Sequence, residues 1–318
     1  MTEQTFLQRR ESSWQEFNEL LTGKRKKIKF RPPEFIKLFR EITQDLNTAR
    51  AHGFDPAIIE RLNVMVNEGY QTLYGQFSWP VKKIIEFITQ TFPRSIRSHW
   101  RGILACSFLF YGVAVFFSIL CIQFPGMAQE IIAEYQLQRI EEMYDPQSEH
   151  FLTPRDVESD ADMFGFYIYN NISIAFRIFA GGILAGIGSL LFLCSNAVYL
   201  GVTSARIINI GYAKTFFPFI IAHSAFELTA IVLAAHAGLM LGYSFFVTRG
   251  LKRSVSVKKA GQDALPIIGG SALMLFVAAI IEAFWSSRHT LPLSLRLGAG
   301  AAMWALVSVY FLFSGRKK

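Results

Sequence analysis

Long apolar runs after residue 102 constrain the fold of this chain more than any other feature. The first extends from Ile103 to Phe124, and further runs follow almost to the C-terminus. A helix of about 20 apolar residues crosses the roughly 30 Å hydrocarbon core of a bilayer. Only 18% of the residues are charged, which is below the roughly 25% of a typical soluble domain. The sequence therefore predicts an all-α, polytopic helical membrane protein.

The apolar runs divide residues 102–318 into the helices of a predicted transmembrane domain. The stretch 164–202 is too long for one perpendicular helix, so we predict a tilted or interfacial helix ending near Ala180 and then a glycine-rich span. Gly182 and Gly186 have the small-xxx-small spacing that lets helix backbones approach closely. The predicted spans are 103–124, 181–202, 216–247, 266–285 and 295–313.

Residues 1–101 predict a separate helical domain. Apolar residues at helical spacing mark one amphipathic helix from Pro33 onward. A second follows Asp55 and Pro56, which form a good N-cap and first-turn pair. A third short helix, 81–92, lies either in the membrane interface or packed within this domain, and the sequence leaves both alternatives open.

Acidic residues are concentrated in the first half of the chain. Only three follow Asp162, namely Glu227, Asp263 and Glu282. Because Lys and Arg flanking membrane helices favour the cytoplasm, the basic cluster before the first span predicts a cytoplasmic N-terminal domain and an acidic outer loop at 127–162. Residues 316–318 are basic and predict a cytoplasmic C-terminus. The other basic residues also flank apolar runs, so we expect no nucleic-acid partner.

Residues just before the first span are predicted to contact lipid headgroups or the membrane interface: Arg94, Arg97, Trp100 and Arg101. The basic stretch 24–29 is either a solvated loop or a second contact with anionic headgroups. The first apolar run begins about a hundred residues into the sequence, so we expect this run, rather than a cleaved signal peptide, to direct insertion.

The run 216–247 conflicts with a simple topology. Arg206 and Lys214 precede it and the basic segment 249–259 follows it, so both flanks favour the cytoplasmic side. One continuous span cannot return to the side on which it began. We therefore predict a broken or re-entrant helical pair that turns near 234–238, with a single tilted span as the alternative.

Few ionisable groups fall inside the apolar runs, and each is a functional candidate because charge is unfavourable at membrane depth. His223 precedes Glu227 by four residues, which places both side chains on one helical face. We predict an intramembrane polar centre that binds an ion or polar headgroup or relays protons, composed of His223, Glu227, Glu282, Asn170 and Asn171. The alternative is a hydrogen-bonded cluster that only fixes helix packing, or, for Glu282, an interfacial anchor.

Motifs of catalysis and cofactor binding are missing from the sequence. The residues after His223 do not form H-E-x-x-H, and His236 falls on a different helical face, so we expect no zinc site. Ser189 lacks the second flanking glycine of a hydrolase elbow and is interpreted as a packing residue. No nucleotide-binding glycine motif is present. We therefore expect no catalytic residue, metal or cofactor, and no disulfides among the three cysteines.

Four segments taken together resemble the stage II sporulation protein M family: Phe164–Ile172 with Asn170-Asn171, the glycine-rich 181–189, His223-Ser-Ala-Phe-Glu-Leu228 and Ile281-Glu-Ala-Phe-Trp285. Phe92-Pro-Arg94 and Trp14 also look like it. The resemblance covers most of the chain, implies an all-helical membrane protein, and draws attention to Asn170, Asn171, His223, Glu227 and Glu282. It also implies a scaffold without catalysis, since the namesake in spore formers works with peptidoglycan-degrading partners. The long N-terminal domain departs from that branch, so we do not carry over a sporulation role.

The resulting hypothesis is a non-enzymatic scaffold in the bacterial cytoplasmic (inner) membrane. Its expected partners are the lipid bilayer and other membrane or envelope proteins, and a homo-oligomer is compatible with the sequence. The alternative is a transporter or flippase-like permease that uses His223, Glu227 and Glu282. A third alternative is an intramembrane hydrolase built on Ser189 and His223.

Overall fold

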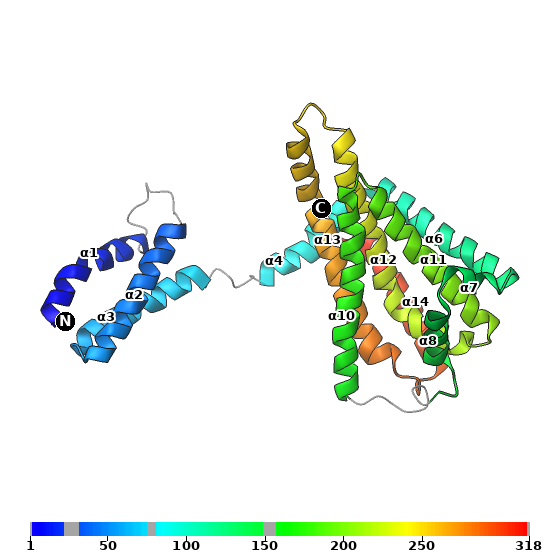
Figure 1. Cartoon of the computed structure of the whole chain (residues 1–318), viewed down its shortest axis with the longest axis horizontal. Helices are drawn as coiled ribbons and strands as arrows, with labels where there is room; N and C mark the ends of the chain where they lie inside the picture. The colour runs from blue at the N-terminus through cyan, green and yellow to red at the C-terminus, as the bar shows by residue number, and fades with distance from the viewer. Residues whose placement is uncertain (1, 22–31, 75–80, 149–156, 317–318) are drawn as a thin grey trace. The chain divides into compact units, whose positions relative to one another are not determined.

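The computed structural model describes residues 2–21, 32–74, 81–148 and 157–316, and every regular element in these ranges is a helix (Figure 1). The prediction of an all-α chain is confirmed. The chain forms two compact units, Met1–Ile84 and Ile85–Lys318, and each is described by itself. The basic stretch 24–29 lies outside the described residues.

The first unit packs three helices around an aromatic core. These are α1 (Glu3–Leu21), α2 (Pro32–His52) and α3 (Pro56–Tyr74). The predicted cap of α3 is confirmed, because the Asp55 carboxylate accepts a hydrogen bond of 2.7 Å from the backbone N–H of Ala57. The largest fully buried side chains of this unit are Phe6, Trp14, Phe17, Phe35, Ile42 and Leu62.

A buried carboxylate joins α1 to α2 inside this unit. Asp45 is 6% exposed and accepts hydrogen bonds from Arg10 Nε at 2.8 Å and Trp14 Nε1 at 2.8 Å. Arg10 also donates to Glu41. A buried charge needs such compensation, so the network fixes how the two helices pack.

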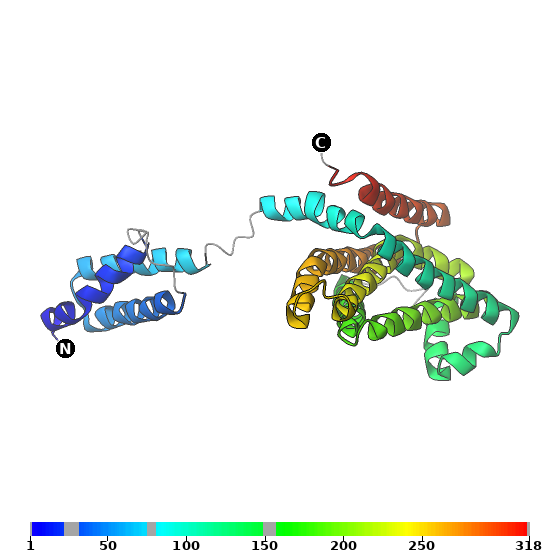
Figure 2. The ribbon, with the colours of Figure 1, turned by 90° about the horizontal axis from the view of Figure 1, so that it is seen from above.

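The second unit is a group of long helices (Figures 1 and 2), which include the apolar runs of the sequence. Its long helices, in chain order, are α6 (Trp100–Gln123), α10 (Val157–Ala180), α11 (Ile187–Asn209), α12 (Ala213–Phe246), α13 (Arg253–Ile281) continued by the π-helix η4 (Glu282–Ser286), and α14 (Leu293–Phe313). Two short helices, α7 (Met127–Ile131) and α8 (Glu134–Tyr144), follow α6. Among the described residues, five helices are long and apolar enough to cross a membrane: α6, α11, α12, α13 with η4, and α14.

The prediction of a re-entrant pair at 216–247 is wrong. α12 is one continuous helix through the expected turn at 234–238, and its only proline in the described helix, Pro218, lies in its second turn. Ala234, Ala235, Ala237 and Gly238 are buried. Small residues at helical spacing let neighbouring helices pack closely against α12, so the residues that suggested a turn are a packing surface.

α11 begins at Ile187, six residues after the predicted start of this span at 181, because glycines form a turn there. α10 ends at Ala180, as expected, and a 3₁₀ turn, η3 (Gly181–Ile183), follows it. Gly186 has a φ of +85° and precedes the first residue of α11. The turn lies directly on α12, since a Cβ on Gly182 would lie within 3 Å of the Gly238 backbone. This close approach explains why the turn is built from glycine.

Residues 85–98 belong to the membrane unit. Here α4 (Val81–Glu86) continues through the π-helix η2 (Phe87–Thr91) into α5 (Phe92–Ser98). The Phe92 ring packs directly against Gly270 of α13, and the Tyr310 hydroxyl of α14 donates a 2.5 Å hydrogen bond to the Ile88 carbonyl. The compact units divide at Ile84, within the predicted helix 81–92, whereas the sequence analysis placed the boundary at 101.

Contacts between helices give their relative directions. Gly201 of α11 packs on Ala114 of α6, and Asn209 donates to the Cys121 carbonyl, so α6 and α11 run parallel.

α10 extends from one end of the bundle to the other. It begins at the Asp160–Arg288 ion pair of 2.6 Å and leads into the turn that lies on Gly238.

Candidate functional site

His223, Glu227 and Glu282 converge on one another. One nitrogen or carboxylate oxygen of each lies within 4.8 Å of those of the other two, which is an arrangement able to hold a metal ion. His223 and Glu227 come from consecutive turns of α12, and their Nε2 and Oε2 atoms lie 3.9 Å apart. Glu282 comes from the first residue of η4, and no sequence pattern fixes its distance from α12.

The η4 segment positions Glu282 and Ser286. A π-helical turn is rare and recurs at functional sites because it shifts the register of the side chains that follow it. Here Ser286, four residues after Glu282, lies with its Oγ 3.1 Å from His223 Nδ1. The His223 ring also packs edge-on against Phe219, with 5.5 Å between ring centroids. These contacts fix the orientation of the imidazole, so Nε2 faces the carboxylates.

Tyr144, the last residue of α8, lies over this centre. Its backbone carbonyl accepts a 2.6 Å hydrogen bond from the Thr215 hydroxyl, and its ring packs edge-on against Phe216 and Phe219. Burial raises the pKa of the Tyr144 phenol, and the nearby carboxylates of Glu282 and Glu227 raise it further. α8 thus covers the end of the bundle at which the polar residues meet.

Arg296 adds a buried positive group beside the centre. It is 4% exposed, and its guanidinium donates a 3.4 Å hydrogen bond to the Ser286 carbonyl. Tyr144, Ser286 and Arg296 were not among the residues predicted from sequence. Only Arg296, a basic residue just inside the last apolar run, carries a signal that could have identified it.

The predicted asparagines lie on α10, outside the group of three. Asn170 Nδ2 donates to Asn171 Oδ1 at 3.0 Å, and Asn171 is 3% exposed. Tyr167, one turn before Asn171, packs with Ala279 and Ala283, so Asn171 lies on the face of α10 that packs in the bundle. Both asparagines therefore lie on the helix that packs against η4, the element that carries Glu282.

The four residues predicted to contact lipid headgroups divide into two pairs with different contacts. Arg94 Nε donates to the Gly315 carbonyl and Arg97 to the Phe311 carbonyl, both at 3.2 Å. Cations in these positions stabilise the C-terminal end of α14. Trp100 is 53% exposed, with the Arg101 guanidinium 5.4 Å from the centroid of its ring.

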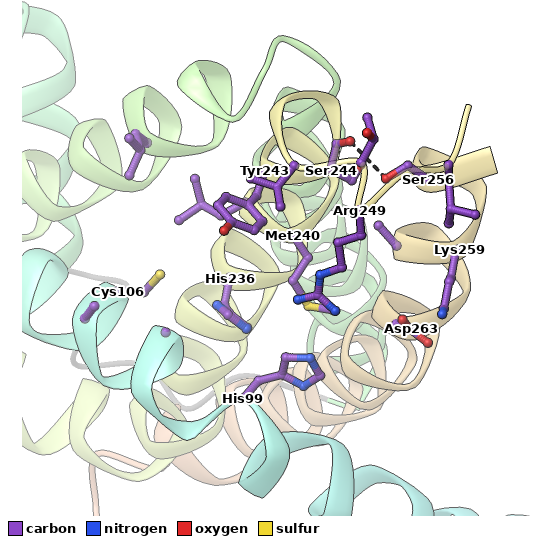
Figure 3. Close-up of a pocket in the computed structure, with 18 of the residues that line it drawn as sticks. His99, Cys106, His236, Met240, Tyr243, Ser244, Arg249, Ser256, Lys259 and Asp263 are labelled. Carbon is purple, nitrogen blue, oxygen red and sulfur yellow. Dashed lines mark hydrogen bonds between the residues drawn. The ribbon is translucent and has the colours of Figure 1, made fainter. Parts of the chain in front are cut away.

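A cavity of about 830 Å³ lies between α6, α12 and the start of α13 (Figure 3). His99 and His236 face one another in it, with their ring centroids 5.5 Å apart. Arg249, Lys259 and Asp263 also line the cavity, and aliphatic side chains form much of the rest of its wall. The cavity lies toward the C-terminal end of α12, to which His236 belongs, whereas His223 lies toward the N-terminal end of the same helix.

Ser189 occupies a packing position, as the sequence suggested. Its hydroxyl is buried and donates a 2.6 Å hydrogen bond to the Ile178 carbonyl of α10. The three cysteines are free.

Two family models match the chain. The model described as Stage II sporulation protein M matches residues 107–287, more than half of the sequence. A model described as Domain of unknown function (DUF8413) matches residues 4–75. No curated protein and no solved structure matched.

Proposed function

The chain belongs to the stage II sporulation protein M family, and we propose that it is a non-catalytic scaffold that assembles other proteins of the bacterial inner membrane and envelope. The observation that supports this proposal best is the three-helix unit. Its core is built from its own helices and includes Trp14 and Phe17. Such a unit, attached to a bundle of membrane helices, offers a partner a preformed surface.

Tight packing of the membrane unit also favours a scaffold. Besides Gly182 against Gly238, the backbone of Gly242 on α12 touches that of Gly186, and Gly201 touches Ala114. Backbone-to-backbone contacts of this kind hold helices in fixed positions. A fixed bundle suits a protein that positions others.

Site-specific photo-crosslinking tests the proposal. A photoreactive phenylalanine analogue at exposed Val64 of α3 is expected to give discrete adducts with other envelope proteins in living cells. The control position is Phe108 of α6, which is 76% exposed on an apolar membrane helix and should contact lipid. Adducts formed only with the chain itself, from Val64 and from other exposed positions of the unit, would contradict a scaffold for other proteins.

We further infer the orientation from the helix directions. Because α6 and α11 run parallel, the chain must cross the membrane once between them. α10, with 24 residues, is about 36 Å long and is the element that can return the chain. Six crossings then follow, counting α10 with the five apolar helices. This arrangement puts the basic segment 249–259 and the C-terminus on the side of the membrane where α6 begins, as the positive-inside tendency favours.

A permease is the second candidate, favoured by one observation. The cavity around His236 lies toward one end of α12, and the centre at His223 and Glu227 lies toward the other. A substrate path along α12 would connect them. In that case Glu227→Gln should abolish a proton-linked transport phenotype, whereas unchanged transport in this variant would exclude a path through the centre.

A further inference from the structure

Two side chains of the polar centre, His223 and Glu227, face each other without a hydrogen bond between them. His223 is 5% exposed; its Nδ1 contacts Ser286, and its Nε2 makes no hydrogen bond to any described residue. The 3.9 Å between Nε2 and Glu227 Oε2 is too long for a hydrogen bond. The Glu227 carboxylate, on a side chain that is 20% exposed, likewise receives no hydrogen bond from the described residues. Buried polar groups nearly always have a partner, and an exception points to a water or ion at the site.

Charge leads to the same conclusion. Carboxylate oxygens of Glu227 and Glu282 lie within 4.8 Å of each other among apolar helices, where two negative charges repel strongly. Arg288 pairs with Asp160, whereas Arg296 donates only to the neutral Ser286 carbonyl and so can offset no more than one of the two negative charges. A divalent cation between the two carboxylates would remove the repulsion.

The donor set indicates the class of cation. An imidazole nitrogen disfavours Mg²⁺ and Ca²⁺, which prefer oxygen ligands, and two carboxylates disfavour a soft ion such as Cu⁺. Ligands about 2.1 Å from a tetrahedral Zn²⁺ lie about 3.4 Å apart, and the atoms of this group need only a small movement to reach that spacing. We propose that His223, Glu227 and Glu282 bind one divalent transition-metal ion of the zinc class.

The contact of His223 with Ser286 fits this site. Metal-binding histidines usually bond through one ring nitrogen to a neighbouring group, which orients the other nitrogen toward the metal. Ser286 Oγ is placed to do this at Nδ1. The ion joins α12 to the start of η4 and, with three protein ligands, keeps one position for water. The site does not depend on the scaffold proposal, because it rests only on these side chains.

Metal analysis of the full-length protein tests the site. The chain, purified in detergent through a tag without histidine from cells grown with Zn²⁺, Mn²⁺ and Fe²⁺, should carry about one transition-metal ion per molecule. Glu227→Gln and Glu282→Gln keep side-chain shape and should each reduce this content at least about tenfold, since one lost ligand weakens binding strongly. Glu130→Gln and His52→Ala, at exposed positions, should keep the native content.

A second measurement covers variants that fold poorly. Native protein stripped with a chelator should regain its melting temperature when Zn²⁺ is added, and X-ray absorption should show nitrogen and oxygen neighbours at about 2.0–2.1 Å. Three results would overturn the site: background metal in the native protein that Zn²⁺ addition does not raise, unchanged metal in both glutamine variants, or a sulfur neighbour near 2.3 Å.

Discussion

His223 Nδ1 of α12 lies 3.1 Å from Ser286 Oγ of η4, joining residues that are 63 positions apart in the chain. This contact sets the register of α12 against the end of α13. It places Glu282 beside Glu227 and leaves His223 Nε2 facing both carboxylates. The polar centre is therefore a product of tertiary packing between two membrane helices.

Gly182 and Gly238 approach so closely that one added methyl group at Gly182 should reduce the stability of the protein. Gly182→Ala introduces a Cβ within 3 Å of the Gly238 backbone, which overpacks the contact between η3 and α12 and should cost about 1–3 kcal/mol. The melting temperature in detergent should fall by several degrees. The matched control is Gly112→Ala on α6, where a Cβ meets no atom of the described residues within 4 Å. Equal melting temperatures for the two variants would contradict the contact.

Much of the fold was predictable because membrane helices have a strong local signal. The span 103–124 corresponds to α6 and 295–313 to α14, each within three residues at its ends. α13 begins at Arg253 rather than near Pro266, since a helix can continue beyond the bilayer and include basic residues that hydropathy excludes. The glycine turn before α11 depends on contact with Gly238, which is not a local property.

The prediction for α12 depends on how α10 is interpreted. Its polar residues, among them Asn170, Asn171 and Arg177, led us to interpret α10 as interfacial or tilted and not as a crossing. Without a crossing by α10, both flanks of α12 favour the cytoplasmic side, which a re-entrant pair satisfies and the alternative of a single tilted span does not. The side chains that lower the hydropathy of α10 include buried Asn171, and burial in protein rather than lipid is invisible to hydropathy.

The site was predictable in part. The spacing of His223 and Glu227 identified one helical face, and Glu282 was recognised because a carboxylate within an apolar run is rare. Their distance from one another, the π-helical turn and the approach of Tyr144 depend on contacts between separate elements. The sequence therefore identified the ionisable members but not the donor set they form.

Reporter fusions test the six-crossing orientation. A reporter that is active only outside the cytoplasm should be active after Gly211, between α11 and α12, and inactive after Gly250, between α12 and α13. If α10 does not cross the membrane, both signals are exchanged. A fusion within α7, after Ala128, should be active in either case and serves as the control.

The Asp45 network predicts a large loss of stability in the three-helix unit. Asp45→Ala leaves Arg10 and Trp14 Nε1 without their buried acceptor and should lower the free energy of unfolding by about 2–4 kcal/mol. Glu11→Ala removes an exposed ion pair with Arg61 and should cost less than about 1 kcal/mol. Urea unfolding of a fragment of residues 1–84 measures both. Similar losses would show that the Asp45 network is not specially stabilising.

The hydrogen bond from Thr215 to the Tyr144 carbonyl predicts how firmly α8 is attached. Thr215→Val keeps the side-chain shape but removes the donor. Since such a bond contributes about 1 kcal/mol, amide exchange in α8 should accelerate roughly fivefold. Thr229→Val removes only a bond within α12 and should leave α8 unchanged. Unchanged exchange in Thr215→Val would show that α8 is held by its apolar contacts alone.

Disulfide trapping of α12 to η4 tests the central claim most directly. The test protein lacks the three native cysteines and carries a protease site in the 247–252 connection, so that cleavage separates α12 from α13 and η4. In this protein, His223→Cys with Ser286→Cys should link the two cleaved fragments after oxidation or with a short thiol-reactive linker. Ala225→Cys with Ser286→Cys, two residues further along α12 and therefore on the opposite helical face, serves as the control. A linked product from the first pair alone is the predicted result, and fragments that separate in both would contradict the convergence of His223, Glu227 and Glu282.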